Sequence, residues 1–268
     1  MSEMGQAILL SVVSHGQAHH VWRLFRDLDD HCQRLSLAVT LTLNIDETLP
    51  FGAADFSFPV RIIRNPHPQG FAENHNAAFK ASFSEPADYF CVVNPDVRIQ
   101  GNVFDALTDC LRRESGVGVV APLVRNLMGG VEDSARLFPT PLTILFKTLG
   151  FKEKLLALPD RGCVAVDWVA GMFMLFPGKI FAEMGGFDER YFLYYEDVDI
   201  CCRLRLAGLK AMLVPGATAI HDARRDSHRR IKYFIWHLTS MLRFFISPVF
   251  FRRWRQIRHS RRKEQPGG

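Results

Sequence analysis

Three carboxylates stand within four residues, at Glu196, Asp197 and Asp199, directly after the aromatic run Tyr191–Tyr195. Aromatic side chains are costly to leave in water, so this run is predicted to pack and to hold the carboxylates in place. A carboxylate held at a partly dry pocket edge can take a proton from a hydroxyl group as a bond forms. The stretch Trp168–Leu206 is therefore the first candidate for chemistry.

The spacing of these carboxylates divides their roles. A helix is predicted over Glu196–Ala207, in which Glu196 and Asp199 share a face while Asp197 points elsewhere. Asp197 is therefore the candidate general base, and Arg203 is placed to pair with Asp199 one turn later. The alternative is helix capping, because the helix dipole stabilises acidic groups in the first turn. Capping does not explain the aromatic run that precedes them.

Two further residues have chemistry that suits a metal ion. Asp96 ends the turn Asn94-Pro95-Asp96, just past the predicted strand Tyr89–Val93, and a carboxylate suits Mg²⁺ or Mn²⁺. The alternative is an ordinary turn, since all three residue types favour turns. His221 follows the predicted strand Lys210–Val214, and a neutral imidazole could complete the metal shell or bind a phosphate. The alternatives are a surface histidine and one that opens the basic tail.

Strands and helices alternate through the first half of the chain, which predicts βαβ units and a mostly parallel sheet. A later half is predicted to be mixed, with its last strand stopped by Pro215. The predicted strands are Ala7–Ser14, Leu37–Leu43, Val60–Arg64, Tyr89–Val93, Val117–Leu123, Asp167–Phe176 and Lys210–Val214. The predicted helical segments are His19–Gln33, Asn74–Phe83, Val103–Glu114, Lys179–Met184 and Glu196–Ala207.

Polar loops follow three of these strands, at Ser14-His15-Gly16, Asn44-Ile45-Asp46 and Asn94-Pro95-Asp96. Ligands of parallel sheets collect beyond the carboxyl ends of the strands, so three such loops favour a binding site there. The turn Asn65–Asn76 is rich in glycine, proline and amides before a helix, which suits a nucleotide or phosphate. A capped helix after a long turn is the alternative.

Composition allows one large α/β domain or two small ones, with 48% hydrophobic residues for a core. The N-terminus has no basic region or cleavage site, so we interpret it as a first strand rather than a signal peptide. The six cysteines have no metal-ligand spacing and are expected to be reduced cytosolic thiols.

Charge is distributed unevenly along the chain. Residues 1–220 carry a net charge of −5, whereas residues 221–268 carry 13 Lys/Arg against 3 Asp/Glu, or +10. Such a tail indicates an anionic partner. The stretch Tyr233–Phe251 is long enough to span a membrane, but His237, Arg243 and Pro248 interrupt it. We expect an interfacial helix on anionic lipid; a helix packed on the body and an RNA-binding tail are the alternatives.

Six motifs together resemble the family 2 glycosyltransferases of the GT-A fold. They are SVVSHGQ (11–17), GFAENHNAA (70–78), VVNPDV (92–97), VDWVAGMFML (166–175), GGFDERYFLYYEDVDICCRLRLAG (185–208) and PGATAIH (215–221). The VSHG start, the VDW-AG strand and the tail are similar to the bacterial rhamnosyltransferases that extend N-acetylglucosaminyl-diphospho-undecaprenol in O-antigen assembly. The resemblance implies an α/β, Rossmann-like, mostly parallel sheet flanked by helices over 1–220, and a basic aromatic helical tail over 221–268.

The resemblance also assigns roles. Asp96 would hold Mg²⁺ or Mn²⁺ on the donor diphosphate, Asn94 would replace the usual first acid of that element, and His221 would lie near the metal and phosphates. Asp197 would deprotonate the acceptor hydroxyl for inverting displacement. The remaining assignments are Ser14 and His15 for base and ribose, Asn44 or Asp46 for the nucleoside, Gly70, Phe71 and Asn76 for the donor-binding turn, and Trp168, Gly171 and Glu196 for sugar or acceptor.

These roles imply transfer of a sugar, L-rhamnose from dTDP-L-rhamnose, to a lipid-linked saccharide in cell-surface polysaccharide synthesis. The protein would work peripherally at the cytoplasmic face of the bacterial inner membrane, and no nucleic acid partner is expected. A transferase of a UDP- or GDP-linked sugar is one alternative, and a catalytically inactive GT-A protein that binds carbohydrate is another.

Overall fold

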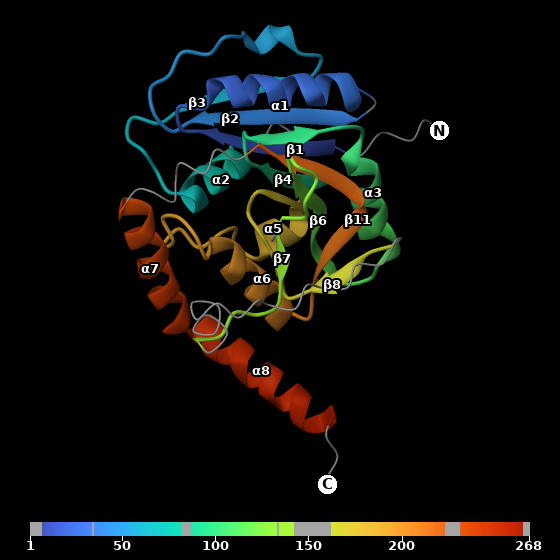
Figure 1. Cartoon of the computed structure of the whole chain (residues 1–268), viewed down its shortest axis with the longest axis vertical. Helices are drawn as coiled ribbons and strands as arrows, with labels where there is room; N and C mark the ends of the chain where they lie inside the picture. Colours follow the sequence, from blue (N-terminus) through green and yellow to red (C-terminus); the bar gives the residue numbers. More distant parts are fainter. Residues whose placement is uncertain are drawn as a thin grey trace.

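The computed structural model describes residues 7–33, 35–81, 87–132, 134–141, 162–222 and 231–264, the last six of these by backbone alone. Within these residues a nine-stranded sheet crosses the molecule in the order β3-β2-β1-β4-β10-β6-β11-β5, with β8 paired to β11 (Figure 1). Its strands are β1 (Ala7–Ser14), β2 (Ser36–Leu43), β3 (Val60–Arg64), β4 (Tyr89–Val93), β5 (Val97–Ile99), β6 (Val117–Asn126), β8 (Val164–Val166), β10 (Phe173–Pro177) and β11 (Lys210–His221). A separate ribbon pairs β7 (Ala135–Arg136) with β9 (Trp168–Val169).

Strand directions divide the sheet as the sequence predicts. β3, β2, β1 and β4 are parallel, and so are β6 and β11, whereas β10 runs antiparallel between β4 and β6. The mostly parallel α/β architecture predicted from the sequence is therefore confirmed.

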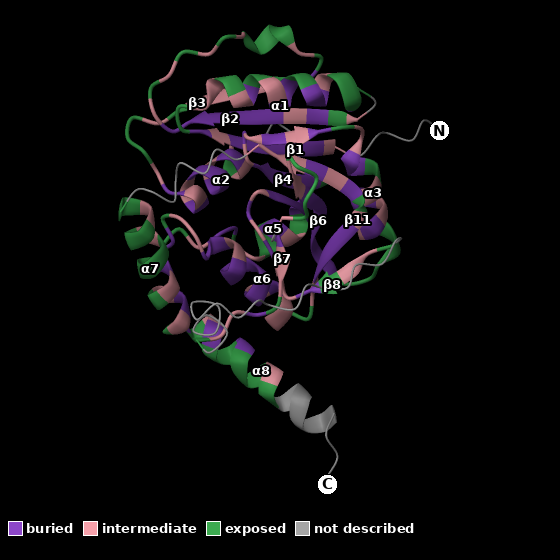
Figure 2. Ribbon diagram, in the orientation of Figure 1, coloured by how far each residue is buried: buried purple, intermediate pink, exposed green. Residues whose placement is uncertain are grey.

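Helices cover both faces of the sheet (Figure 1), and most residues of the central strands between them are buried (Figure 2). One core cluster joins alternate strand residues to α1 (Ala18–His31) and α3 (Val103–Arg113). The opposite cluster involves α2 (Phe71–Lys80), α5 (Gly178–Glu183) and α6 (Glu196–Leu206). Because successive side chains of a strand point to opposite faces, near-continuous apolar strands such as β1 and β4 supply both cores.

Two predicted strand boundaries are wrong. The predicted strand Asp167–Phe176 breaks around Gly171, because β9 pairs with β7 while β10 pairs with β4. The last strand does not stop at Pro215 but continues to His221. Its register against β6 shifts between Val214 and Thr218, and proline is tolerated in such a bulge because no ladder N–H is needed there.

The expectation that all six cysteines are free thiols is also wrong for one pair. Cys110 of α3 and Cys163, just before β8, form a disulfide across 53 residues of sequence. The fold brings them together because α3 and β8 both lie against β11. The other four cysteines are free and buried.

The C-terminal helices α7 (Ile231–Phe245) and α8 (Pro248–Glu264) pack on the body through a third apolar cluster. Phe244 and Phe250 are buried against Tyr195 and Phe138, and Arg253 bonds to Asp167 at 2.7 Å. Among the described residues, no single helix has the length and hydropathy of a membrane span. The pair α7 and α8, bent by 59°, meets that criterion only when taken together.

Candidate active site

Asp96 and His221 meet at the sheet edge where β5 pairs with β11. The antiparallel register places Val97 opposite His221, and the Asp222 N–H donates to the Asp96 carbonyl at 2.8 Å. The Oδ2 atom of Asp96 consequently lies 3.4 Å from Nε2 of His221. Its Oδ1 atom is buried and has no hydrogen-bond partner among the residues that the structure describes.

A third side chain completes this group, and sequence reasoning missed it. Glu132 Oε2 lies 2.7 Å from Nδ1 of His221. The Glu132 N–H donates to the Val124 carbonyl, so a short excursion after β6 returns the chain to His221. The only signal in the sequence is an acidic residue shortly after the turn glycines Gly129 and Gly130.

The two carboxylates control the protonation of the histidine. Burial lowers the pKa of His221, but hydrogen bonds and charge from Asp96 and Glu132 outweigh burial and raise it to about 9. The imidazole therefore carries a proton at neutral pH in the absence of other ligands.

Asp197 is held at the start of α6 by backbone N–H groups. Its Oδ2 accepts from Gly171 at 3.0 Å and its Oδ1 accepts from Val198 at 2.8 Å. Burial raises the pKa of Asp197, while these hydrogen bonds lower it. The pKa of Asp197 is raised overall, so this half-buried carboxylate is a stronger proton acceptor than an ordinary aspartate.

Strained backbone precedes this helix. Tyr194 and Tyr195 adopt φ of 71° and 70°, in the left-handed region that bulky residues rarely enter. Tyr195 is buried against Phe244, so packing holds the two residues there. Such strain persists where the surrounding structure demands it and commonly lies at functional sites.

Glu196, a predicted sugar or acceptor residue, is buried at the start of α6. Only 4% of its surface is exposed, and its Oε2 atom has no hydrogen-bond partner within the described parts of the chain. Burial, followed by the charge of Asp197, raises the pKa of Glu196 well above its usual range. Burial therefore disfavours the charged form of Glu196 beside Asp197.

Asp199 has a structural partner. It pairs with Arg203 at 2.7 Å, as the helical spacing predicts, and Arg203 also donates to the carbonyls of Met184 and Gly186. This network holds α6 to the segment before it.

A backbone turn connects the two groups of candidate residues. The Asn94 N–H donates to the Met172 carbonyl at 2.9 Å, while the neighbouring Gly171 N–H donates to Asp197. The turn between β9 and β10 therefore lies between Asp197 on one side and the segment Asn94–Asp96 on the other.

Two predicted glycines allow close approach around this turn. A Cβ atom on Gly70 would lie 2.8 Å from the Phe192 carbonyl oxygen, and one on Gly171 would lie 3.0 Å from the Phe71 ring. The Phe71 N–H also donates to the Phe192 carbonyl. The start of α2 is thus held against the aromatic run. The helix begins at Phe71, three residues before the predicted start, because the Glu73 carboxylate accepts a hydrogen bond from the N–H of the N-cap residue Gly70.

Trp168 lies half-buried beside this region. Its Nε1 donates to the Leu137 carbonyl at 3.0 Å, and the Arg136 guanidinium lies 5.5 Å from its ring centre. The indole is therefore held in one orientation by the β7–β9 ribbon.

Ser14, His15 and Asn44 lie together beyond β1 and β2. Ser14 accepts from the Gln17 N–H, and Asn44 bonds to the backbone of Gln69 through both amide atoms. His15 is exposed, with Nδ1 3.4 Å from the Asn44 amide. These residues bring the loop that follows β1 to the loop that precedes α2, as their positions at strand ends predict.

The other two polar residues predicted to bind the donor are Asp46, in the loop after β2, and Asn76, within α2. Asp46 is exposed, and it is the next residue, Glu47, that accepts from the N–H groups of Gly16 and Ala18. Asn76 is buried and bonds to the backbone of Phe187 through both its amide oxygen and its amide nitrogen. Asn76 therefore holds α2 to the segment that leads to α6.

The sequence model of the family described as "Glycosyltransferase like family 2" matches residues 33–240. The rhamnosyltransferase WbbL of Escherichia coli K12 is 36% identical over 185 residues, which cover 65% of this chain and 69% of that protein. An N-acetylglucosaminyl-diphospho-decaprenol L-rhamnosyltransferase of Mycobacterium tuberculosis is 34% identical over 154 residues, 53% of this chain and 49% of that protein.

The fold also has solved relatives. The crystal structure of GalNAc-T7 with UDP, GalNAc and Mn²⁺ matches with a TM-score of 0.63 at 15% identity, over 84% of this chain and 45% of that one. Identity this low supports the similarity of fold alone, and the fold is that of the GT-A class expected from the motifs.

Proposed function

The chain belongs to the family 2-like glycosyltransferases, and we propose that it transfers L-rhamnose from dTDP-L-rhamnose to a hydroxyl of a lipid-linked saccharide. The sugar is proposed from the two relatives at 36% and 34% identity, both named as rhamnosyltransferases. The chain spans about half of the mycobacterial relative, so donor, acceptor and pathway are inferred for this chain.

The geometry that carries this proposal is the position of Asp197. Its two oxygens are held by the backbone of Gly171 and Val198, and the next residue of the turn, Met172, bonds to Asn94. In the proposed reaction Asp197 takes the proton of the acceptor hydroxyl while that oxygen attacks the sugar carbon. Attack from the face opposite the leaving group inverts the anomeric centre and needs no enzyme nucleophile.

Besides a base, the proposed reaction needs a cation site beside the donor diphosphate, and Asp96 and His221 fit such a site. Asp96 Oδ1, which has no hydrogen-bond partner in the described part of the chain, is an oxygen ligand suited to a hard divalent cation, and His221 Nε2 lies 3.4 Å from the other oxygen of that carboxylate. Among the described residues, no three His, Cys, Asp or Glu side chains are arranged to hold a metal alone, so donor phosphates and water would supply further ligands. A bound Mg²⁺ or Mn²⁺ would neutralise the charge that grows on the departing diphosphate.

The donor nucleoside is proposed to lie against Ser14, His15 and Asn44. The amide network of Asn44 with Asn65 and Gln69 holds this edge in one arrangement. Phe71, whose ring approaches Gly171, would lie between the nucleotide and Asp197. Polar groups that are held in one arrangement before binding limit the entropy lost when a ligand binds.

The tail is proposed to hold the enzyme on an anionic membrane surface, such as the cytoplasmic face of the inner membrane. The outward face of α7 carries exposed apolar residues at the helical spacing of one stripe: Ile231, Phe234, Ile235, Leu238 and Leu242. Basic residues follow on α8, which gives the combination that binds anionic lipid. We propose residues 1–220 as the transferase domain and 221–268 as the tail.

The proposal is tested by donor screening followed by transfer. We expect the purified chain to release dTDP from dTDP-L-rhamnose in the presence of a short-chain N-acetylglucosaminyl diphospholipid. The product anomer, determined by NMR, should be inverted, and EDTA should suppress the reaction. Faster turnover of a UDP- or GDP-linked sugar would replace the proposed donor, and no turnover of any sugar nucleotide would favour an inactive carbohydrate-binding protein.

A further inference from the structure

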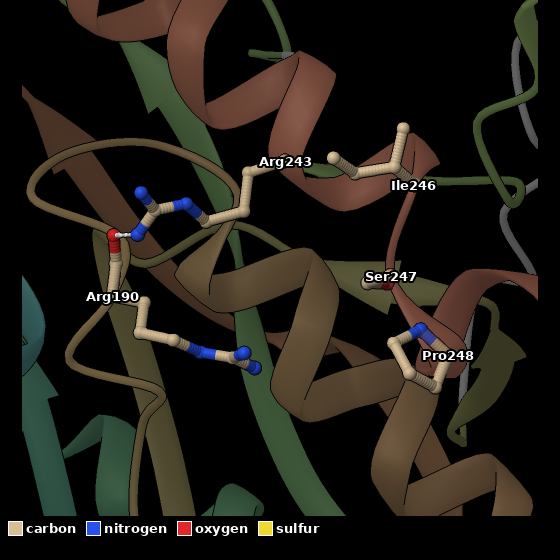
Figure 3. A pocket seen from close by; sticks show the side chains of 5 residues that line it. All are labelled: Arg190, Arg243, Ile246, Ser247 and Pro248. Carbon is tan, nitrogen blue, oxygen red and sulfur yellow. Dashed lines mark hydrogen bonds between the residues drawn. The ribbon is translucent and has the colours of Figure 1, made fainter.

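The bend between α7 and α8 forms a cavity of about 440 Å³ that the proposed reaction does not use. Its lining joins Arg190, from the segment before α6, to the helix bend at Arg243, Ile246, Ser247 and Pro248 (Figure 3). We propose that this cavity binds the phosphate group of an anionic lipid headgroup. The inference extends the proposed membrane contact of the tail and names a specific site within it.

The charge of the cavity suits one phosphate. Arg190 and Arg243 bring two positive charges, and the carboxylate of Asp188, which Arg190 holds in a fork at 2.5 to 3.0 Å, offsets one of them. Arg243 donates to the carbonyl oxygen of Arg190, the contact drawn in Figure 3. That bond uses one of the five N–H groups of a guanidinium, and guanidinium groups favour phosphate oxygens.

The start of α8 adds to this field. The helix begins at Pro248, and Ser247 caps it by accepting from the Phe250 N–H at 3.1 Å. The N-terminal end of a helix carries a partial positive charge that stabilises a nearby anion. Helix start and guanidinium groups therefore face the same cavity from α7, α8 and the segment before α6.

The apolar surroundings favour a lipid over a free anion. Ile246 lines the cavity and is 75% exposed, and the apolar stripe of α7 that includes Leu242 leads to it. A free phosphate gains nothing from apolar neighbours, whereas a headgroup arrives with acyl chains that do. We therefore expect the site to bind a phosphate that belongs to a lipid headgroup rather than a free phosphate ion.

The experiment uses the full chain in EDTA with three probes: dihexanoyl phosphatidic acid below its critical micelle concentration, dihexanoyl phosphatidylcholine and inorganic phosphate. We expect saturable binding of phosphatidic acid by calorimetry, at least tenfold tighter than either other probe. Hydrogen exchange should slow in residues 243–251 on binding. No saturable binding, or binding of inorganic phosphate as tight as that of phosphatidic acid, would overturn the proposal without any substitution.

Matched variants test the lining. We expect Arg243→Gln to weaken phosphatidic acid binding at least tenfold, whereas Arg252→Gln, which removes an exposed charge from α8, should weaken it less than threefold. Equal losses in both variants would mean that only overall charge matters and would overturn the site. Donor turnover on the same preparations reports separately on the proposed transfer, so the two ideas fail independently.

Discussion

Nδ1 of His221 lies 2.7 Å from Oε2 of Glu132, while Nε2 of the same ring faces Asp96 at 3.4 Å. A histidine bonded in this way has one ring nitrogen oriented by a carboxylate and the other directed at a neighbouring oxygen ligand. This is the arrangement by which carboxylates orient metal-binding histidines and raise their basicity. Glu132 is therefore expected to orient His221, although it lies 89 residues away in sequence and was not predicted as a site residue.

Replacing Glu132 with glutamine tests this orientation. We expect Glu132→Gln to weaken Mn²⁺ binding by about 10- to 100-fold, because the imidazole loses its oriented partner. NMR titration should also show a lower pKa for His221, since one of the groups that raise it is gone. Glu114→Gln, which removes an exposed carboxylate near Lys210, is the control and should change neither quantity. An unchanged His221 pKa would contradict the role.

The raised pKa of His221 also predicts a pH dependence of stability. The value rises from 6.5 to about 9 on folding, so the protonated imidazole stabilises the folded state fully below pH 6.5. This contribution, on the order of 2–3 kcal/mol, should be lost as pH rises from 6.5 through 9. Urea unfolding in EDTA at several pH values measures it. The His221→Gln variant should lack this pH-dependent loss of stability. If the free energy of unfolding of the wild type and of the variant changed in parallel with pH, the pKa of His221 would not be raised on folding.

The base assignment predicts a separation of binding from chemistry. Asp197→Asn keeps the shape of the side chain but cannot accept the proton, so transfer should fall by on the order of 100- to 10,000-fold. Calorimetry should show nucleotide affinity within threefold of the wild type. Glu183→Gln, in an exposed pair with Lys179, is the matched control and should be fully active. Retained transfer in Asp197→Asn would remove Asp197 from the mechanism.

Gly70 and Gly171 should differ in their tolerance of a methyl group. In Gly70→Ala the new Cβ meets backbone atoms of Phe192 at 2.8 to 2.9 Å, and backbone cannot rotate away. We expect a loss of about 1–3 kcal/mol by denaturant unfolding. Gly171→Ala should cost less stability because the Phe71 ring can turn, but it should raise the KM for the donor.

Gly216→Ala is the control for both glycine variants, since a Cβ there meets nothing within 4 Å and its φ is not in the left-handed region. It should match the wild type in both measurements. Equal stability of all three variants would mean that the close approach at Gly70 is not required.

The apolar stripe of α7 should determine vesicle binding. Phe234 and Ile235 are 67% and 53% exposed, so Phe234→Ser/Ile235→Ser should leave the melting temperature nearly unchanged. The amount of this double variant that sediments with anionic vesicles should fall at least tenfold, because each apolar side chain contributes about 1.5–3 kcal/mol to the binding free energy when it is fully buried. Leu127→Ser, at another exposed apolar position, is the control. Equal sedimentation of the double variant and wild type would exclude this face as the contact.

Local patterns predicted the layered part of the fold well. The boundaries of β1, β3 and β4 agree with the predicted strands. β1 and β4 are buried on both faces and nearly continuous in hydrophobicity, whereas β3 is an edge strand of intermediate burial. The break at Gly171 and the passage of β11 through Pro215 were not predicted, because each depends on which strand lies alongside. Pairing partners are distant in sequence, so no local pattern encodes them.

Hydrophobic periodicity and helical spacing act over a few residues, so the order of amino acids predicts which residue types stand at strand ends and at the start of α6. Asp197 as a candidate base and the pair of Asp199 with Arg203 follow from that spacing alone. The burial of Glu196, the contact of Glu132 with His221 and the contact of Arg243 with Arg190 arise only when the chain folds. These relationships depend on the register of β5 against β11 and on the docking of α7, because burial and proximity are set by packing between distant segments.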